Sequence, residues 1–173
     1  VDRDSDGLAD MGKDLEDRAR TAMSSLGVTY PELFGYYPQP KGLLFPAFLS
    51  VQNLSGIYSP FTIEANYNSA MVSYNLPFTI CHELSHLRGF MQEEEANFIG
   101  FLACVSTDDT AFNYSGYLLG WIYATNELYE TDYDTFEEVY SRLSDNVKAD
   151  LSANSSFWNR YDSKVAEVSG QIN

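Results

Sequence analysis

Apolar residues recur at helical spacing near the start of the chain and again over most of its second half. In the first segment they lie three or four residues apart, at Leu8, Met11, Leu15, Ala19 and Met23. This period predicts a helix over residues 1–27. Asp4, Ser5 or Asp6 would cap its beginning, and Gly27 would end it.

The stretch from residue 28 to residue 75 has no helical period and is rich in Pro, Gly, Tyr and Phe. This composition predicts loops and two to four short strands. The best strand is Phe61–Tyr67, where apolar and polar residues alternate. It is either a structural strand or an edge strand on which an extended peptide substrate could pair.

The helical period returns in residues 76–173. The predicted helices are Pro77–Arg88, Gln92–Val105, Thr110–Tyr129, Tyr133–Ser144, and one or two more between Asn146 and Ile172. Gly89 is placed to end the first of them in a left-handed cap. Residues 1–173 are therefore predicted to form one α+β domain, mostly helical, with a small β element before the helical part.

The charge and composition of the chain limit the kinds of partner that it can bind. The chain has 10 Lys and Arg against 25 Asp and Glu, a net charge of −15, which excludes a nucleic-acid phosphate backbone as partner. No run of about 20 apolar residues is present, so we expect no bilayer span in this stretch. The chain begins at Val1, which indicates a fragment or a processed product. Cys81 and Cys104 are predicted to be buried free thiols.

The candidate chemistry lies in one stretch, which reads FTICHELSHLRGFMQEEEANFIG. It contains both histidines of the chain, His82 and His86, four residues apart and therefore on one face of a helix. Two such histidines can bind one zinc ion, and Glu83 between them can act as general base on a water molecule. The alternative is a charged helix that only happens to contain two histidines.

The third metal ligand should come from the three glutamates that follow. On a helix, Glu93 shares a face with small or polar residues, namely Ala96, Asn97, Gly100, Ala103 and Cys104. A face of small residues lets two helices approach closely, so Glu93 is preferred as ligand, with Glu94 and Glu95 left open. Asn97, one turn further on, could hydrogen-bond a liganding histidine.

Two weaker signals concern other residues. The spacing of Asp2, Asp4, Asp6 and Asp10 is that of the start of a calcium loop, but Lys13 occupies the position where such a loop needs a glutamate. An acidic helix cap is therefore the preferred interpretation. Tyr114 and Tyr117 are among the tyrosines that could donate a hydrogen bond to an oxyanion.

The motif resembles the gluzincin metallopeptidases, in which HExxH is followed by a glutamate ligand on a second helix. A closer resemblance joins SGIYSPFTIEANYN, the histidine stretch, YSGYLLG and LSANSSFW, from about Gly56 to Ile172. In these segments the chain resembles the bacterial domain-of-unknown-function family 3810. That resemblance implies a zincin-like helical domain on the extracytoplasmic face of a membrane, anchored by transmembrane helices that precede it.

Two hypotheses follow from these residues. The first is a zinc-dependent peptidase or amidohydrolase that acts on a peptide or protein substrate, with His82, His86 and Glu93 as ligands and Glu83 as base. The second is a zinc-binding sensor or scaffold of the cell envelope without turnover. Structural zinc sites are usually closed by four protein ligands, whereas three are evident here, which favours the enzyme.

Overall fold

The computed structural model describes residues 1–171, and the side chains of residues 1–162. Its elements are β1 (Asp2–Arg3), β2 (Ala9–Asp10), α1 (Leu15–Thr29), the short 3₁₀ helix η1 (Pro31–Leu33), β3 (Lys41–Gly42), α2 (Pro46–Val51), β4 (Gly56–Ser59), β5 (Glu64–Tyr67), α3 (Asn75–His86), α4 (Glu93–Val105), α5 (Thr110–Thr131), α6 (Tyr133–Ser141) and α7 (Asp145–Gln171). The predicted α+β class, mostly helical, is confirmed. Ile172, the predicted end of the last helical region, lies outside the described residues.

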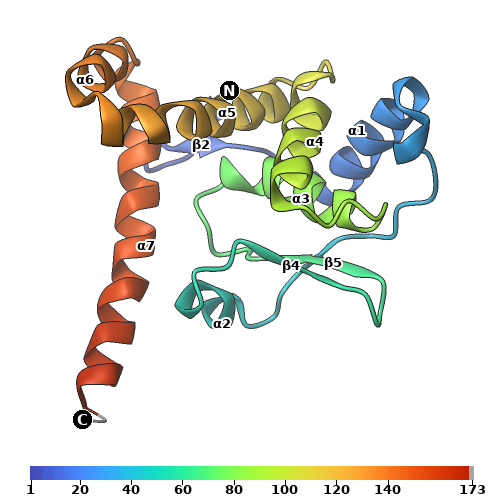
Figure 1. The fold of residues 1–173 in the computed structure, drawn as a ribbon, viewed down its shortest axis with the longest axis horizontal. Coiled ribbons are helices and arrows are strands. Elements are labelled where there is room, and N and C mark those ends of the chain that lie inside the picture. The colour runs from blue at the N-terminus through green and yellow to red at the C-terminus, as the bar shows by residue number, and fades with distance from the viewer. Residues whose placement is uncertain (172–173) are drawn as a thin grey trace.

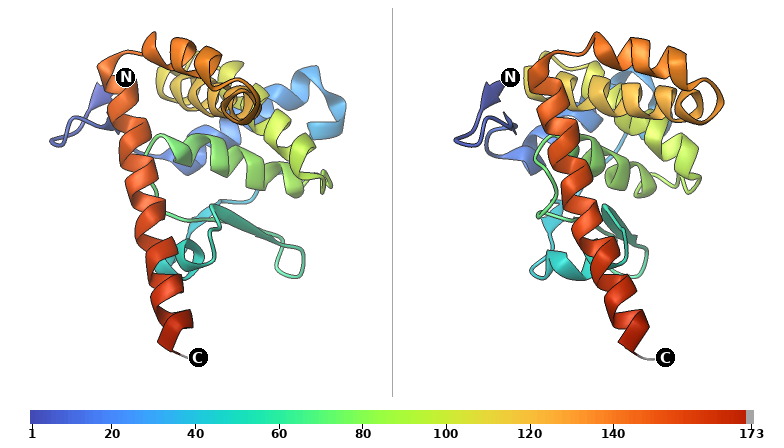
Figure 2. Two further views of the ribbon diagram at one scale, coloured as in Figure 1. Left: turned by 60° about the vertical axis from the view of Figure 1, so that its left-hand side comes forward. Right: turned by 90° about the vertical axis from the view of Figure 1, so that its left-hand side faces the viewer.

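Helix α3 lies at the centre of the fold (Figure 1). Helices α1, α4 and α5 pack against one side of it, and strands β4 and β5 lie along the other. Its buried apolar side chains, including Phe78, Ile80 and Leu84, join those of α1, α4 and α5 in one core. Helix α7 runs down the side of the molecule, past the sheet, and contacts α2 (Figure 2). Within the described residues, no helix combines the length and apolarity that a membrane crossing requires.

The helices after residue 75 agree closely with those predicted from the sequence. Gly89 has a φ of +91°, so the predicted left-handed stop after α3 is confirmed. Helix α5 begins where Asp109 accepts hydrogen bonds from the backbone N–H groups of Ala111 and Phe112. Cys81 on α3 and Cys104 on α4 are both buried and free, as expected.

The three-stranded sheet differs from the strand prediction. Its order is β3-β5-β4, so β5 is central and β4 is an edge strand. Only the second half of the predicted strand Phe61–Tyr67 is β-structure, because residues 61–63 form the turn between β4 and β5. Phe61 is 98% exposed there, and Ile63 takes a left-handed φ of +54°. The alternation of apolar and polar residues therefore continued into a turn. The edge-strand alternative for this segment is wrong, because β5 is the central strand of the sheet.

The first fourteen residues are not helical, which corrects the prediction of a helix over residues 1–27. Strands β1 and β2 form an antiparallel hairpin. In its turn the Asp4 carboxylate accepts hydrogen bonds from the N–H groups of Asp6 and Leu8. Short acidic side chains compete with a helix by bonding their own backbone in this way, so the acidic residues made a turn and not a helix cap.

Helix α1 also continues past Gly27, which was expected to end it. A Cβ atom at Gly27 would lie 2.9 Å from the carbonyl oxygen of Leu33. This glycine therefore permits η1 to pack closely against α1, and the helix continues to Thr29.

A buried carboxylate fixes the N-terminal hairpin to the helices. Asp150 on α7 is fully buried and accepts two contacts from the Arg3 guanidinium, at 2.8 and 2.9 Å. It also accepts hydrogen bonds from the Tyr114 hydroxyl and from the backbone N–H of Ala9. The charge of Asp150 is thus paired and its oxygens are satisfied, as a buried carboxylate requires.

Candidate metal centre

His82 and His86 lie one turn apart on α3, and their ring nitrogens converge. The two Nε2 atoms are 3.1 Å apart, and the rings are perpendicular with centroids separated by 4.8 Å. Both side chains are largely buried, at 12% and 9% exposed. The apolar residues on the opposite side of α3 anchor the helix in the core, and this fixes the direction of the histidine face.

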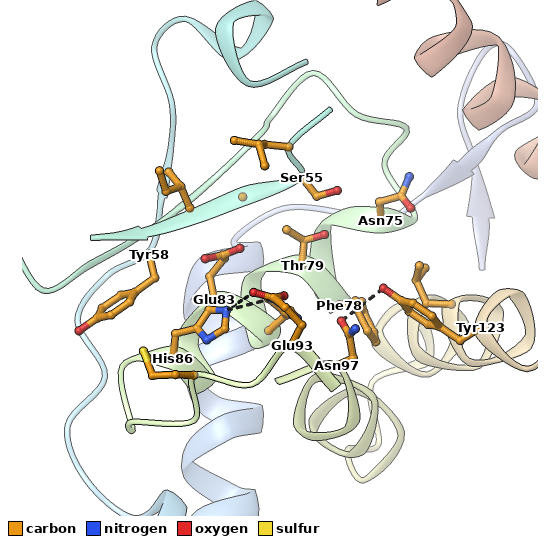
Figure 3. Close-up of a pocket in the computed structure, with 16 residues that line it drawn as sticks. Ser55, Tyr58, Asn75, Phe78, Thr79, Glu83, His86, Glu93, Asn97 and Tyr123 are labelled. Atoms are coloured by element: carbon orange, nitrogen blue, oxygen red, sulfur yellow. Dashed lines mark hydrogen bonds and ion pairs between the residues drawn. The ribbon is translucent and has the colours of Figure 1, made fainter. Parts of the chain in front are cut away.

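The first turn of α4 brings Glu93 to the same point. Its Oε2 lies 3.3 Å from Nε2 of His82, and its Oε1 lies 3.8 Å from Nε2 of His86 (Figure 3). Close approach of the two helices allows this, because a Cβ atom at Gly100 would lie only 3.3 Å from backbone atoms of α3. The small-residue face of α4 therefore packs against α3, as predicted from the sequence. Glu94 and Glu95 are exposed and do not join the group.

One potential ligand atom from each of His82, His86 and Glu93 lies near a common point. All of them lie within 4.8 Å of one another. Two ligands of a tetrahedral zinc ion, each about 2.0–2.1 Å from it, would be about 3.3–3.4 Å apart. The two Nε2 atoms are 3.1 Å apart and Oε2 of Glu93 lies 3.3 Å from Nε2 of His82, both close to that value, whereas the other carboxylate oxygen, Oε1, lies 3.8 Å from Nε2 of His86. His82, His86 and Glu93 could therefore hold one metal ion.

The histidines are held in the form that binds metal. Nδ1 of His86 lies 2.7 Å from the carbonyl oxygen of Phe90, so it donates there and leaves Nε2 free for a metal. Burial and the nearby His86 lower the pKa of His82, although Glu93 and a hydrogen bond with Asn97 act in the opposite direction. His82 is thus neutral near pH 7, as a ligand must be. Asn97 lines the same cavity as His82, and its role as hydrogen-bond partner of a liganding histidine stays a prediction.

Glu83 lies in the same cavity but outside the ligand group. It is 5% exposed, and its Oε2 is buried without a hydrogen-bond partner. Burial, and to a lesser extent the charge of Glu93, raises the pKa of Glu83 to about 8. Its other oxygen lies against β4, where a Cβ atom at Gly56 would come within 2.4 Å of it. A buried carboxyl group without a partner is costly in a fold, and such groups are common at functional sites.

The cavity has a volume of about 520 Å³ and lies between β4, α3, α4 and α5. Strand β4 contributes one wall through the segment 55–58, which includes Tyr58. Tyr123 of α5 contributes the other side, and its hydroxyl donates a 3.3 Å hydrogen bond to Oδ1 of Asn97 (Figure 3). Burial and Glu93 raise the pKa of Tyr123, which keeps its hydroxyl protonated.

The sequence did not point to Tyr123. It pointed to Tyr114, which bonds Asp150, and to Tyr117, and neither lines this cavity. Nothing in the sequence separates Tyr123 or Tyr58 from the other tyrosines, because their positions depend on how α5 and β4 pack against α3.

The N-terminal aspartates do not form a second metal site. Asp2 faces Asp10 across the hairpin, and Asp4 is bonded to backbone N–H groups. Among the side chains that the structure describes, three or more potential ligands converge only at His82, His86 and Glu93.

Comparison with known proteins identifies the family to which the chain belongs. A family model described as "Protein of unknown function (DUF3810)" matches residues 1–173. The match includes the first 55 residues, where the sequence motifs offered little resemblance. No curated protein and no solved structure matches the chain.

Proposed function

The chain belongs to this family of unknown function, and we propose that it is a zinc-dependent peptidase. The observation that carries the proposal is the pairing of two features in one cavity. Ligand atoms of three residues lie within 4.8 Å of one another, and the buried Glu83 carboxyl beside them has no hydrogen-bond partner on Oε2. A purely structural zinc site has no need of the second feature.

Each residue has a defined task in this proposal. His82, His86 and Glu93 hold the ion. Bound zinc would supply Lewis acidity, which brings the pKa of a water molecule close to neutrality and polarises a carbonyl group. Glu83 takes the proton from the attacking water and later donates it to the leaving amine. Burial raises the pKa of Glu83 far above that of an ordinary carboxyl group, and a bound cation would lower it again, towards the neutral pH at which one carboxyl group can accept and return the proton.

Tyr123 is the candidate for stabilising the oxyanion. Its hydroxyl lines the cavity and stays protonated, and in the reaction its single proton would turn from Oδ1 of Asn97 to the negative charge that develops on the carbonyl oxygen. Asn97 orients both Tyr123 and His82 through its side chain.

Strand β4 is the place where an extended peptide would bind in this proposal. Strand β4 is an edge strand, and its residues Gly56, Ile57 and Tyr58 line the cavity beside Glu83. Backbone groups on a free sheet edge bind peptides by adding a strand, which holds the chain without demanding a particular sequence. The placement of the domain outside the cytoplasm, next to a membrane anchor, is a separate proposal that rests on the family resemblance alone.

The test is a Glu83→Gln variant compared with wild type in a broad peptide library, together with zinc analysis of both proteins. We expect wild type to cleave peptides and the variant to lose about 10²- to 10⁴-fold in rate while it keeps its zinc. Equal rates would show that Glu83 is not the base. A wild type that binds zinc and cleaves nothing would favour the sensor or scaffold instead.

A further inference from the structure

A second depression adjoins the metal cavity, between α4 and α5. It has a volume of about 650 Å³, within the range of small-ligand pockets. Its apolar lining is formed by Phe98, Phe101, Tyr117, Gly120 and Trp121. We call this depression the aromatic groove.

The floor of the aromatic groove is built into the packing of the two helices. The Phe101 ring lies against Gly120, where a Cβ atom would come within 2.9 Å of the ring. Tyr117 meets the same ring edge-on, with centroids 6.3 Å apart. Trp121 is supported from behind by Phe136 and Tyr140 of α6. The groove is therefore preformed, with its aromatic walls fixed by neighbouring rings.

The aromatic groove is continuous with the metal cavity. Phe78, Asn97 and Tyr123 line both depressions. The Phe78 ring lies 6.5 Å from the ring of His82 and 6.0 Å from that of Tyr123. A ligand in the groove would thus contact side chains that also line the metal cavity.

The groove leaves large apolar side chains in contact with solvent. Phe98 and Tyr117 are both 61% exposed. Apolar surface gathered in a concave site usually serves binding, because exposing it to water is unfavourable.

We propose that the aromatic groove is the subsite for a large apolar side chain of the peptide substrate, next to the bond that is cleaved. This inference rests on the proposed peptidase function. Continuity with the metal cavity favours a substrate group over an unrelated partner. Two other occupants of the groove are disfavoured by charge, namely an anionic amphiphile such as a fatty acid and a second copy of this acidic chain. Glu94 lies at the rim of the groove, and the chain has a net charge of −15, so both would be repelled.

Binding can be measured without turnover, since Trp121 lines the groove and only one other tryptophan, Trp158, is present. A Trp158→Phe, Glu83→Gln protein makes Trp121 the only tryptophan. The probes are two capped peptides of alanine and serine that differ at one central position, phenylalanine or alanine. We expect the phenylalanine peptide to bind about tenfold or more tightly, because burial of one large apolar side chain discriminates to that extent.

Variants of the groove complete the test. Phe98→Ser and Tyr117→Ser change exposed residues, so both variants should fold. Each should remove most of the preference for the phenylalanine peptide over the alanine peptide. The matched control is Phe34→Ser, because Phe34 is 71% exposed and lies away from both depressions. This variant should keep the preference for the phenylalanine peptide. The preference should persist after zinc is removed with a chelator, because the groove is made of apolar side chains.

Equal binding of the two peptides, or an unchanged preference in both groove variants, would overturn the inference. So would binding of the uncharged detergent dodecyl maltoside at Trp121 while neither peptide binds. Because this assay uses a variant that lacks the base, a failure of the peptidase proposal leaves the binding result readable. The two failures are therefore distinguishable.

Discussion

Two glutamates of the site occupy opposite environments. The Glu83 carboxyl is buried, has one oxygen without a partner and has a pKa raised to about 8. The Glu93 side chain is 71% exposed and lies close to both histidines. Burial favours the protonated form of a carboxyl group, whereas a ligand must be ionised. The two environments therefore support the proposal in which Glu83 transfers protons and Glu93 binds the metal.

Replacement of the three neighbouring glutamates tests the ligand assignment. Glu93→Ala should weaken zinc affinity by about 100-fold or more, because it removes one of three protein ligands. Glu94→Ala and Glu95→Ala should change it by less than about threefold, since they alter only the local charge. The measurement is competition with a zinc chelator of known affinity. Equal losses in all three variants would contradict the role of Glu93.

Strand β4 and helix α3 approach so closely that one position must be glycine. At Gly56, a Cβ atom would lie 2.4 Å from Oε1 of Glu83 and 2.7 Å from its Cγ. The whole Glu83 side chain would have to shift, since its burial leaves little free space around it. The strand thus determines where the proposed base points, although the base belongs to the helix.

A Gly56→Ala variant tests this dependence. We expect peptide cleavage to fall by about 10- to 100-fold, because small misplacements of a catalytic group are costly, while zinc content stays unchanged. Ser59→Ala on the same strand is the control, since Ser59 does not line the cavity and bonds only to the nearby Thr62. If Gly56→Ala keeps the wild-type rate, Glu83 does not depend on the strand for its position.

Whether an element could be predicted from the sequence depends on whether it is determined by neighbouring residues or by contacts between distant segments. Helices α3 and α4, and the meeting of His82, His86 and Glu93, follow from local periodicity, a left-handed glycine and a face of small residues. The edge position of β4, the place of Tyr123 and the burial of Asp150 depend on segments far apart in the chain. The prediction of a helix at the N-terminus failed for a local reason. The Asp4 carboxylate accepts hydrogen bonds from the nearby backbone, and this stabilises a turn in place of the helix.

At the scale of the whole molecule, the proposed base contributes to the pH dependence of stability. Because burial raises the pKa of Glu83 to about 8, the folded protein should keep this proton up to about pH 8, whereas the unfolded chain releases it near the ordinary value of 4.5. Between these values the folded state binds one more proton than the unfolded state. This contribution to stability is therefore complete below pH 4.5 and is lost as the pH rises towards 8.

A comparison of metal-free wild type with Glu83→Gln should reveal this loss. Near pH 4.5 the two proteins should be similarly stable, because the protonated carboxyl and the amide are both neutral. As the pH rises to 8, wild type should lose stability relative to the variant by up to about 1.4 kcal/mol per pH unit. Urea unfolding in the presence of a chelator, repeated across this range, measures the difference. Parallel curves would mean that Glu83 is ionised in the folded protein, and it would then need a partner that its buried Oε2 does not have.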